Sequence, residues 1–361
     1  MTGAPTLDAA ERNETVAMIH DSITAVVPPA GDLQRIRALR FKTPGFDRAV
    51  WQEMCNLGWL GLRVPEAQGG SGLGLREFCA LAEGLGAGLV PEPLIPTAMA
   101  ARLLQGPALA ALLVGERLIV PAWQECANSL DGSGATQLRE GRLSGVKRFV
   151  PAAGGADAFL VSADAGLALV ARDAPGVQLR LETTQDGGEF GELTLADAPA
   201  RTVAADVHQF EVALDEAALA TAAYLLGVIE RSFAITLDYL KLRKQFGRAI
   251  GSFQALQHRA VDLRIQMALA RASVESAAAT LDTEPAMALR QAAVSRAKAR
   301  AADTALLVTR QAIQLHGAIG YTDEYDMGLY LRKAMTLVNL YGSADVHRAR
   351  YARVTAGMDH A

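Results

Sequence analysis

The sequence has few cysteines, few aromatic residues and no cluster of basic residues. Its 3 cysteines lack the C-x-x-C spacing of many metal and redox sites, and a chain of 361 residues is long enough to bury a large core without disulfides. We therefore expect a reducing, cytoplasmic location. Lysine and arginine are dispersed and the formal net charge is -4, so the sequence gives no electrostatic footprint for a nucleic acid partner.

Signals for export, membrane insertion and metal binding are also missing. The N-terminal residues MTGAPTLDAAERNET are polar and acidic, so no signal peptide is expected. The most apolar stretch, residues 98–123, is interrupted by Gly106, Pro107 and Gly115, and falls short of the roughly 20 continuous residues of a membrane helix. His316 and His347 are too isolated to indicate a metal centre, and we predict neither a membrane span nor a metal site.

Hydrophobic periodicity predicts three segments. Residues 1–116 read as an N-terminal helical domain, and in residues 117–205 short apolar runs alternate with turn residues, as in a small β sandwich or barrel. In residues 206–361 apolar residues recur at spacings of three and four, which predicts a C-terminal four-helix bundle. One of its helices is expected to start at Thr283–Pro285. The predicted class is mainly α with a central β domain. The predicted strands are Leu118–Trp123, Arg142–Val150, Ala158–Ala163, Leu167–Arg172, Val177–Thr184 and Glu192–Leu195.

Two blocks in the last segment are the most informative: Y-L-K-L-R-K-Q-F-G-R-A-I-G-S-F-Q at 239–254, and Q-A-I-Q-L-H-G-A-I-G-Y-T-D-E-Y at 311–325. We expect the helix of the first block to end at Gly247, with Arg243 and Lys244 in its last turn, where the macrodipole favours cations. The second block predicts a helix end followed by glycines, which can form a cap or let the backbone approach a phosphate or a flat ring. Alone, each block is an ordinary helix end.

Together, R-K-Q-F-G-x-x-I-x-x-F-Q and the later Q-L-H-G-x-x-G-Y-x-x-E-Y closely resemble the C-terminal domain of acyl-CoA dehydrogenases. The run from Trp51 to Glu66, followed by Gly69-Gly70-x-Gly72-Leu73, is similar to the first domain of the same family, so the resemblance covers nearly the whole chain. It implies the same order of helical, β and helical domains. It also implies bound FAD, removal of hydrogens from the α and β carbons of an acyl-CoA thioester, and an electron-transferring flavoprotein as the electron acceptor.

The resemblance also assigns residues to the cofactor. In the family, the arginine of R-x-x-F-G reaches across a dimer interface to the FAD pyrophosphate of the neighbouring subunit, and Arg243 holds this position, with Phe246 and Gln254 beside it. Ser343 matches a hydroxyl that contacts the flavin in relatives, and it could equally be the N-cap of the final helix. The segment matched to the adenosine side of the flavin comprises Gln314, Leu315, His316, Gly317 and Ala318.

The usual catalytic base of the family has no counterpart. It is a glutamate in Y-E-G-T, and the stretch N-L-Y-G-S-A-D-V-H-R at 339–348 places Tyr341 or Gly342 there. A phenol with a reference pKa near 10 is a poor base for an α-proton. Some relatives carry the base on the first helix of the C-terminal bundle, where the count reaches Ala217. Glu216, one residue away, is therefore an alternative base, unless it only complements the helix dipole.

The β domain departs from the family as well. The segments matched to T-E-P-x-x-G-S-D and W-I-T are Trp123–Cys126 and Arg148–Pro151, and Pro151 has no amide hydrogen for a flavin nitrogen. The residues that would contact the FAD of a neighbouring subunit thus match the family motifs. The residues that would surround the reactive flavin ring and supply the base do not. This asymmetry favours a subunit of an α2β2 heterotetramer with a paralogous chain, resembling heteromeric enzymes of steroid side-chain degradation. The alternatives are a self-sufficient homotetramer with Glu216 as base, and a catalytically silent scaffold.

Overall fold

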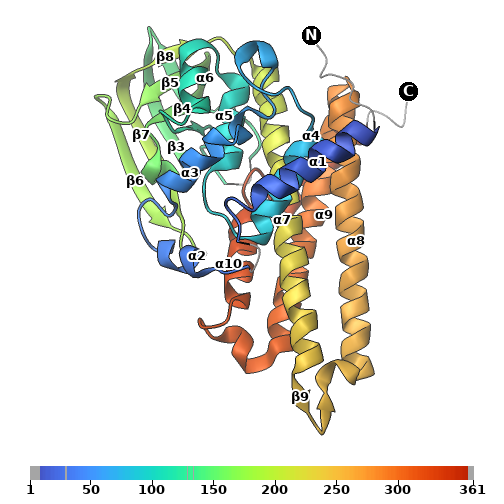
Figure 1. Ribbon diagram of the computed structural model, residues 1–361. Helices are drawn as coiled ribbons and strands as arrows, with labels where there is room; N and C mark the ends of the chain where they lie inside the picture. The colour runs from blue at the N-terminus through green and yellow to red at the C-terminus, as the bar shows by residue number, and fades with distance from the viewer. Residues whose placement is uncertain (1–8, 29–30, 128, 133, 357–361) are drawn as a thin grey trace. The chain divides into compact units, whose positions relative to one another are not determined.

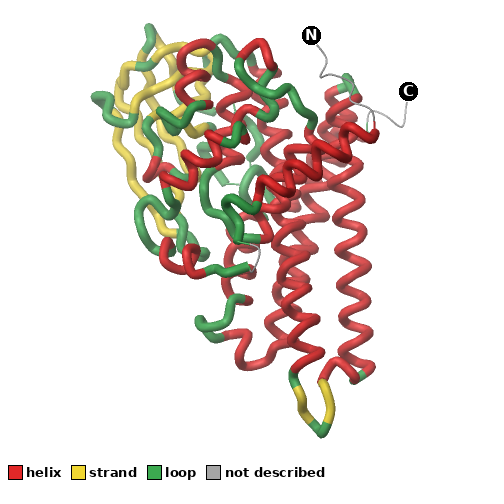
Figure 2. Tube along the Cα trace, viewed as in Figure 1, coloured by secondary structure: helices red, strands yellow, loops and turns green. Residues whose placement is uncertain are grey.

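The computed structural model describes residues 9–28, 31–127, 129–132 and 134–356 (Figure 1). Contacts group the chain into two compact units. Unit 1 comprises Met1–Val26, Gln34–Phe78 and Pro91–Ala217, and unit 2 comprises Val27–Leu33, Cys79–Val90 and Ala218–Ala361. Helices, then strands, then helices follow one another along the chain, which confirms the predicted fold class. Figure 2 shows the helices in red and the strands in yellow. The domain boundaries near residues 116 and 205 stay a prediction.

Among the helices of unit 1, α5 lies against η1 and α6. Asp47 caps α3, because its side chain accepts a hydrogen bond from the amide of Ala49 at 2.8 Å. Helix α5 is buried along almost its whole length and lies against strand β1. The helical elements are α1 (Ala9–Ile23), α2 (Gln34–Leu39), α3 (Arg48–Asn56), η1 (Trp59–Gly61), η2 (Glu66–Gln68), the start of α4 (Leu75–Ala87), α5 (Leu94–Leu103), α6 (Gly106–Leu113), η3 (Ala153–Gly155) and the start of α7 (Val207–Leu242).

The strands of unit 1 form two four-stranded sheets. One has the order β1-β4-β5-β8, with β1 and β4 parallel, and the other is antiparallel with the order β2-β3-β7-β6. Every predicted strand is present, whereas the three-residue strands β2 and β8 were not predicted because so short a run has no periodicity. The strands are β1 (Ile119–Ala122), β2 (Gln137–Arg139), β3 (Arg142–Pro151), β4 (Ala158–Ala163), β5 (Gly166–Ala171), β6 (Val177–Thr183), β7 (Glu189–Pro199) and β8 (Arg201–Val203).

Unit 2 is built around α9, which lies against α8, α10 and α11. The rest of α4 crosses the rest of α7 with backbones almost in contact: a Cβ atom added at Gly86 would lie 2.0 Å from the carbonyl oxygen of Tyr224, and one at Gly227 would lie 1.9 Å from that of Glu83. Glycine is therefore required at both crossing points. The elements are α7, β9 (Lys244–Gln245), β10 (Arg248–Ala249), η4 (Ile250–Ser252), α8 (Gln254–Thr283), α9 (Met287–His316), η5 (Gly317–Tyr321), α10 (Met327–Leu337) and α11 (Ala344–Thr355).

Two predicted helix boundaries are wrong. Thr283 does not start a helix; it is the last residue of α8, and Ala286 is the N-cap of α9. The Glu284 carboxylate accepts from the amide of Ala286 at 2.8 Å, so the acidic residue shapes the turn before the cap. Helix α7 ends at Leu242 and not at Gly247, because the following residues pair as a β-hairpin.

Helix α7 is long and apolar enough to cross a membrane, judged by length and composition alone. However, 94% of its most apolar 18-residue window is buried inside the protein. The core helix of a globular protein passes the same test, so this single helix is weak evidence for a membrane span.

Candidate functional site

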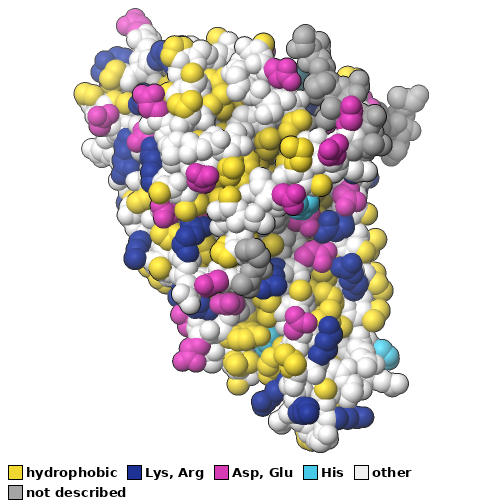
Figure 3. Space-filling view, in the orientation of Figure 1, with side chains coloured by type: hydrophobic (Ala, Val, Ile, Leu, Met, Phe, Trp, Pro, Cys, Tyr) yellow, Lys and Arg dark blue, Asp and Glu magenta, His cyan; other side chains and the backbone are white. Residues whose placement is uncertain are grey.

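The first motif block forms an exposed hairpin at the end of α7. Lys244 and Gln245 pair with Ala249 and Arg248, and the turn residues Phe246 and Gly247 have φ angles of 53° and 77°. Two consecutive residues with positive φ are typical of a tight hairpin turn, in which Gly247 is the natural occupant and Phe246 an unusual one. The Phe246 side chain is 90% exposed. Lys and Arg side chains gather at this tip (Figure 3).

The second block lies beside the first within unit 2. The ring of His316, at the end of α9, stacks on the ring of Tyr239 of α7, with ring centroids 4.4 Å apart. The Nδ1 atom of His316 lies 2.7 Å from the carbonyl oxygen of Ala312, and its Nε2 atom lies 3.1 Å from the hydroxyl of Tyr325. Burial lowers the pKa of His316. His316 thus holds the end of α9 in place, and both of its ring nitrogens already have partners within the protein.

Three exposed side chains of the two blocks have polar groups without a hydrogen-bond partner among the described residues. Among the residues that the structure describes, the side chains of Arg243, Gln254 and Gln314 make no hydrogen bond or ion pair, and all three are exposed. Gly317 has a φ angle of 66° and open space where a Cβ would stand. A guanidinium, two amides and an open glycine backbone fit the phosphates and the adenosine side of a dinucleotide such as FAD. Leu315 is buried, so it supports this surface from below.

The position of the usual base is held by a buried phenol. Tyr341 is 1% exposed, has a φ angle of 55°, and its hydroxyl has no hydrogen-bond partner among the described residues. Burial raises the pKa of this phenol well above its usual value, because the phenolate would lack solvation. A general base must be deprotonated near the working pH, and for a phenol this means the phenolate. The geometry therefore gives no support to Tyr341 as a proton acceptor.

Ser343 takes the capping role that the sequence left open. Its hydroxyl accepts a hydrogen bond from the amide of Val346 at 3.4 Å, and it is the N-cap residue of α11. This contact leaves the hydroxyl hydrogen of Ser343 available for another acceptor.

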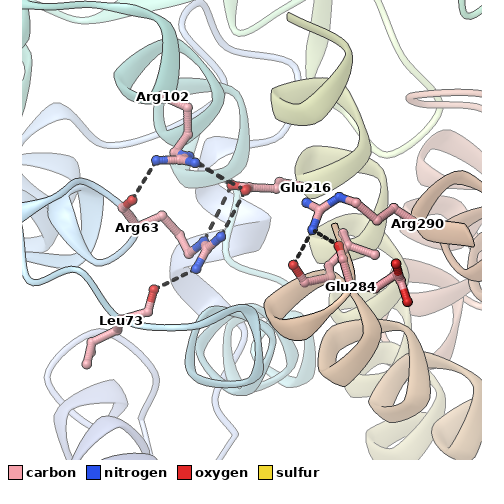
Figure 4. Close-up of polar contacts among 7 residues, drawn as sticks. Arg63, Leu73, Arg102, Glu216, Glu284 and Arg290 are labelled. Atoms are coloured by element: carbon pink, nitrogen blue, oxygen red, sulfur yellow. Dashed lines mark hydrogen bonds and ion pairs between the residues drawn. The ribbon is translucent and has the colours of Figure 1, made fainter. Parts of the chain in front are cut away.

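Glu216 lies in an ion-paired network within unit 1 (Figure 4). Its carboxylate accepts from Nη2 of Arg63 at 2.9 Å and from Nε of Arg102 at 3.1 Å, and only 5% of its side chain is exposed. Burial acts to raise the pKa of Glu216, but the two guanidinium groups outweigh it and lower this pKa to about 2. A carboxylate so strongly stabilised is a weak base, so this geometry favours a structural role for Glu216.

Arg63 and Arg102 extend the network beyond Glu216. Arg63 also donates to the carbonyl oxygen of Leu73 at 2.6 Å, and Arg102 donates to the carbonyl oxygen of Arg63 at 2.9 Å (Figure 4). The carboxylate therefore ties the start of α7 to α5 and to the segment before α4. Sequence spacing gave no signal for this network, because its members are far apart along the chain.

The β segments matched to the reactive half of the site are held by a second ion pair. Nζ of Lys147, a residue with 0% exposure, donates to Glu125 at 2.7 Å, to the carbonyl oxygen of Trp123 at 3.2 Å and to Ser162 at 3.3 Å. Glu125 also accepts from the amide and hydroxyl of Thr136. Burial lowers the pKa of Lys147. Glu125 therefore has a structural role. The sequence analysis included Glu125 in a matched segment, but it did not identify Lys147 or the ion pair.

Within the described ranges, no group of three or more His, Cys, Asp or Glu residues could hold a metal ion. Cys55 and Cys79 are buried and Cys126 is exposed, and none of the three forms a disulfide bond.

Two domain models of one protein family match the N-terminal and C-terminal parts of the chain. Residues 207–356 match the model described as acyl-CoA dehydrogenase, C-terminal domain, and residues 11–106 match the model of the N-terminal domain. Among curated proteins, the acyl-CoA dehydrogenase IpdE2 of Mycolicibacterium smegmatis is 30% identical over 332 residues, which are 91% of this chain and 95% of that protein. FadE27 of Mycobacterium tuberculosis, another acyl-CoA dehydrogenase, is 30% identical in an alignment of 346 residues that covers 86% of this chain and 89% of that protein.

Solved structures of heteromeric proteins are also similar. The Tcur3481-Tcur3483 steroid ACAD superposes with a TM-score of 0.86 at 30% identity, covering 98% of this chain and 99% of that one. The ChsE4-ChsE5 complex from Mycobacterium tuberculosis gives a TM-score of 0.84 at 26% identity over the same shares of the two chains.

Proposed function

This chain belongs to the acyl-CoA dehydrogenase family, and we propose that it is a subunit that completes a shared FAD site while lacking a base of its own. The reaction would be α,β-dehydrogenation of an acyl-CoA thioester in the cytoplasm. A paralogous chain would form an α2β2 assembly with it and supply the carboxylate base. When bound, FAD supplies the two-electron oxidation that the side chains cannot perform, and an electron-transferring flavoprotein would receive the electrons.

One observation carries this proposal: the exposed surface formed by Arg243, Gln254 and Gln314 has polar groups with no partner in the described chain. Exposed donors that face outward are suited to a ligand held mainly by another subunit. Arg243 would bind a phosphate oxygen through a charge-assisted hydrogen bond, and Gly317 would let the backbone approach the adenosine.

The lack of a suitable base in this chain also supports the proposal that the paralogous chain supplies it. Tyr341 is buried with a raised pKa, and Glu216 is held by two arginines with a lowered one. Neither group is suited to accept the α-proton at neutral pH. The homotetramer that uses Glu216 as its base therefore has less support than the shared site.

The acyl group is proposed from the relatives alone. The two similar heteromeric structures include one whose name describes it as a steroid enzyme, and we propose a bulky, steroid-type side chain as the substrate class.

The test is a visible absorption spectrum with the protein-to-flavin ratio, for this chain alone and after coexpression with its paralogue. The proposal expects no flavin on the isolated chain and about one FAD per pair. About one FAD per isolated chain, bleached by an acyl-CoA, would refute the shared site. A stable assembly without flavin or activity in any pairing would support the scaffold instead.

A further inference from the structure

The middle of α9 contains a buried cation that the proposed reaction does not use. Lys298 has 0% exposure, and its ammonium group forms no ion pair with any described carboxylate. Burying an ammonium without a counter-ion is unfavourable, so its hydrogen bonds must offset much of the cost. Nζ donates to the carbonyl oxygens of Val338 at 3.0 Å, Gly342 at 3.0 Å and Leu337 at 3.4 Å.

These carbonyl groups belong to both ends of one loop, residues 338–343. Leu337 is the last residue of α10 and Val338 is its C-cap, whereas Gly342 stands just before the N-cap of α11. A cation is favoured at a helix C-terminus, where carbonyl groups lack partners within the helix. The Lys298 ammonium therefore joins the end of α10 to the start of α11.

A histidine holds the middle of the same loop. Nε2 of His347 lies 2.8 Å from the carbonyl oxygen of Tyr341, and Nδ1 lies 3.5 Å from the hydroxyl of Ser295, which accepts from Nε of Arg350 at 2.7 Å. A carbonyl oxygen can only accept, so Nε2 carries the proton. Burial and the charges of Lys298 and Arg350 lower the pKa of His347 to about 3, which keeps the ring neutral.

These contacts hold the loop in an unusual conformation. Tyr341 and Gly342 have consecutive positive φ angles of 55° and 98°, which a tyrosine rarely adopts. Such a backbone persists where the surroundings determine it strongly, and here the carbonyl groups of residues 338, 341 and 342 are all bonded to buried side chains. The loop carries the position at which relatives have their base.

We propose that Lys298 and His347 are positioning residues that fix loop 338–343 as a static element with Tyr341 buried, so that this loop takes no part in turnover. The second half of this inference rests on the proposed function, in which the base comes from the partner. The lysine acts through the backbone of the loop and touches neither substrate nor cofactor.

The test compares Lys298→Met, which keeps the length of the side chain but no donor, with Lys298→Gln, which keeps a donor. Thr309→Val is the matched control, because Thr309 is a buried α9 residue whose hydroxyl donates to Ala305 within the same helix. Amide hydrogen exchange of Leu340, Val346 and His347 is measured in the full chain. We expect exchange at least tenfold faster in Lys298→Met, partly restored in Lys298→Gln, and unchanged in Thr309→Val.

The same variants are then measured in the coexpressed pair, with kcat and KM for an acyl-CoA and the flavin content. Values within twofold of the parent protein support the inference. Unchanged exchange in Lys298→Met would refute the proposal that Lys298 fixes loop 338–343. A tenfold loss of kcat with unchanged KM would refute the proposal that this loop takes no part in turnover. If Lys298→Met does not fold, Lys298→Gln decides by the same criteria. The exchange measurement needs no flavin, so absence of flavin in the parent pair would refute the shared site alone.

Discussion

The ring of Tyr239 stacks on the ring of His316 with 4.4 Å between their centroids and 30° between their planes. One residue belongs to the last turns of α7 and the other ends α9. This contact brings the hairpin block and the glycine block to the same end of unit 2. Segments that are separate in the sequence thus form one surface, on which Arg243 and Gln314 are both exposed.

Replacing Arg243 tests this surface directly. Arg243→Gln in the coexpressed pair should weaken FAD binding roughly tenfold to a hundredfold, because a hydrogen bond from a charged donor contributes about 1.5 to 3 kcal/mol. Flavin titration followed by fluorescence gives the affinity. Arg264→Gln is the control: Arg264 is an exposed α8 arginine that pairs with Glu230. Equal loss in both variants would mean that Arg243 has no specific role.

Glu216→Gln separates a structural carboxylate from a base. We expect it to lower the free energy of unfolding by about 2 to 4 kcal/mol, because it breaks two partly buried ion pairs. Turnover per bound flavin should stay within twofold, whereas loss of a base would reduce it roughly a hundredfold or more. Urea unfolding and steady-state kinetics measure the two effects. Glu211→Gln, an exposed neighbour on α7, should change neither.

The stability contributed by Glu216 should depend on pH in a defined direction. Its pKa falls from 4.5 to about 2 on folding, so its contribution is complete above pH 4.5 and is lost as the pH falls toward 2. By linkage the total is about 3 kcal/mol, at roughly 1.4 kcal/mol per pKa unit. Urea unfolding of parent and Glu216→Gln should therefore converge between pH 5 and pH 2.5. A constant difference over this range would contradict the ion-pair account.

The order of the segments and most strands could be predicted from the sequence, because each rests on local patterns. Strand β4 is found at Ala158–Ala163, as predicted, since its apolar run is bounded by turn residues on both sides. The predicted C-terminal end of α7 and the predicted start of α9 were wrong, because β-hairpin pairing and the Glu284 contact decide them, and neither is visible in helical periodicity.

The partners of charged residues could not be predicted. Lys298 and Lys147 look like any helix or strand lysine in the sequence, yet both have 0% exposure. Their acceptors lie in other elements, such as the carbonyl of Gly342 for Lys298 and the carboxylate of Glu125 for Lys147. Only the tertiary structure reveals that these groups are buried, and therefore that their charges matter.

The Glu125–Lys147 pair should show strong coupling. Glu125→Gln alone should cost about 2 to 4 kcal/mol, because it leaves a buried ammonium without its counter-ion. The double variant with Lys147→Met should recover most of this loss, since no buried charge remains. The free energies of unfolding of the single and double variants give the coupling. The exposed pair Arg139–Asp164 provides the comparison, and its cycle should give less than about 1 kcal/mol. Additive effects for Glu125 and Lys147 would contradict the pairing.

Lys298 should make the stability of the protein rise with pH above neutrality. Burial lowers its pKa from 10.5 to about 7, so between these values the unfolded chain binds the proton and the folded chain has released it. The free energy of unfolding then increases with pH by at most roughly 1.4 kcal/mol per unit, and it is lowest below pH 7, where the buried lysine is charged.

Lys298→Met should remove the pH dependence that Lys298 contributes to the free energy of unfolding, whether or not the variant is less stable than the parent protein at a given pH. Urea unfolding from pH 6 to pH 9 should give a difference between parent and variant that is flat below pH 7 and shifts in favour of the parent above it. Thr309→Val removes a hydroxyl and no charge, so its free energy of unfolding should change with pH in the same way as that of the parent protein from pH 6 to pH 9. Parallel curves for Lys298→Met as well would mean that Lys298 keeps its proton in the folded protein up to pH 9, held by the carbonyl groups of Val338 and Gly342.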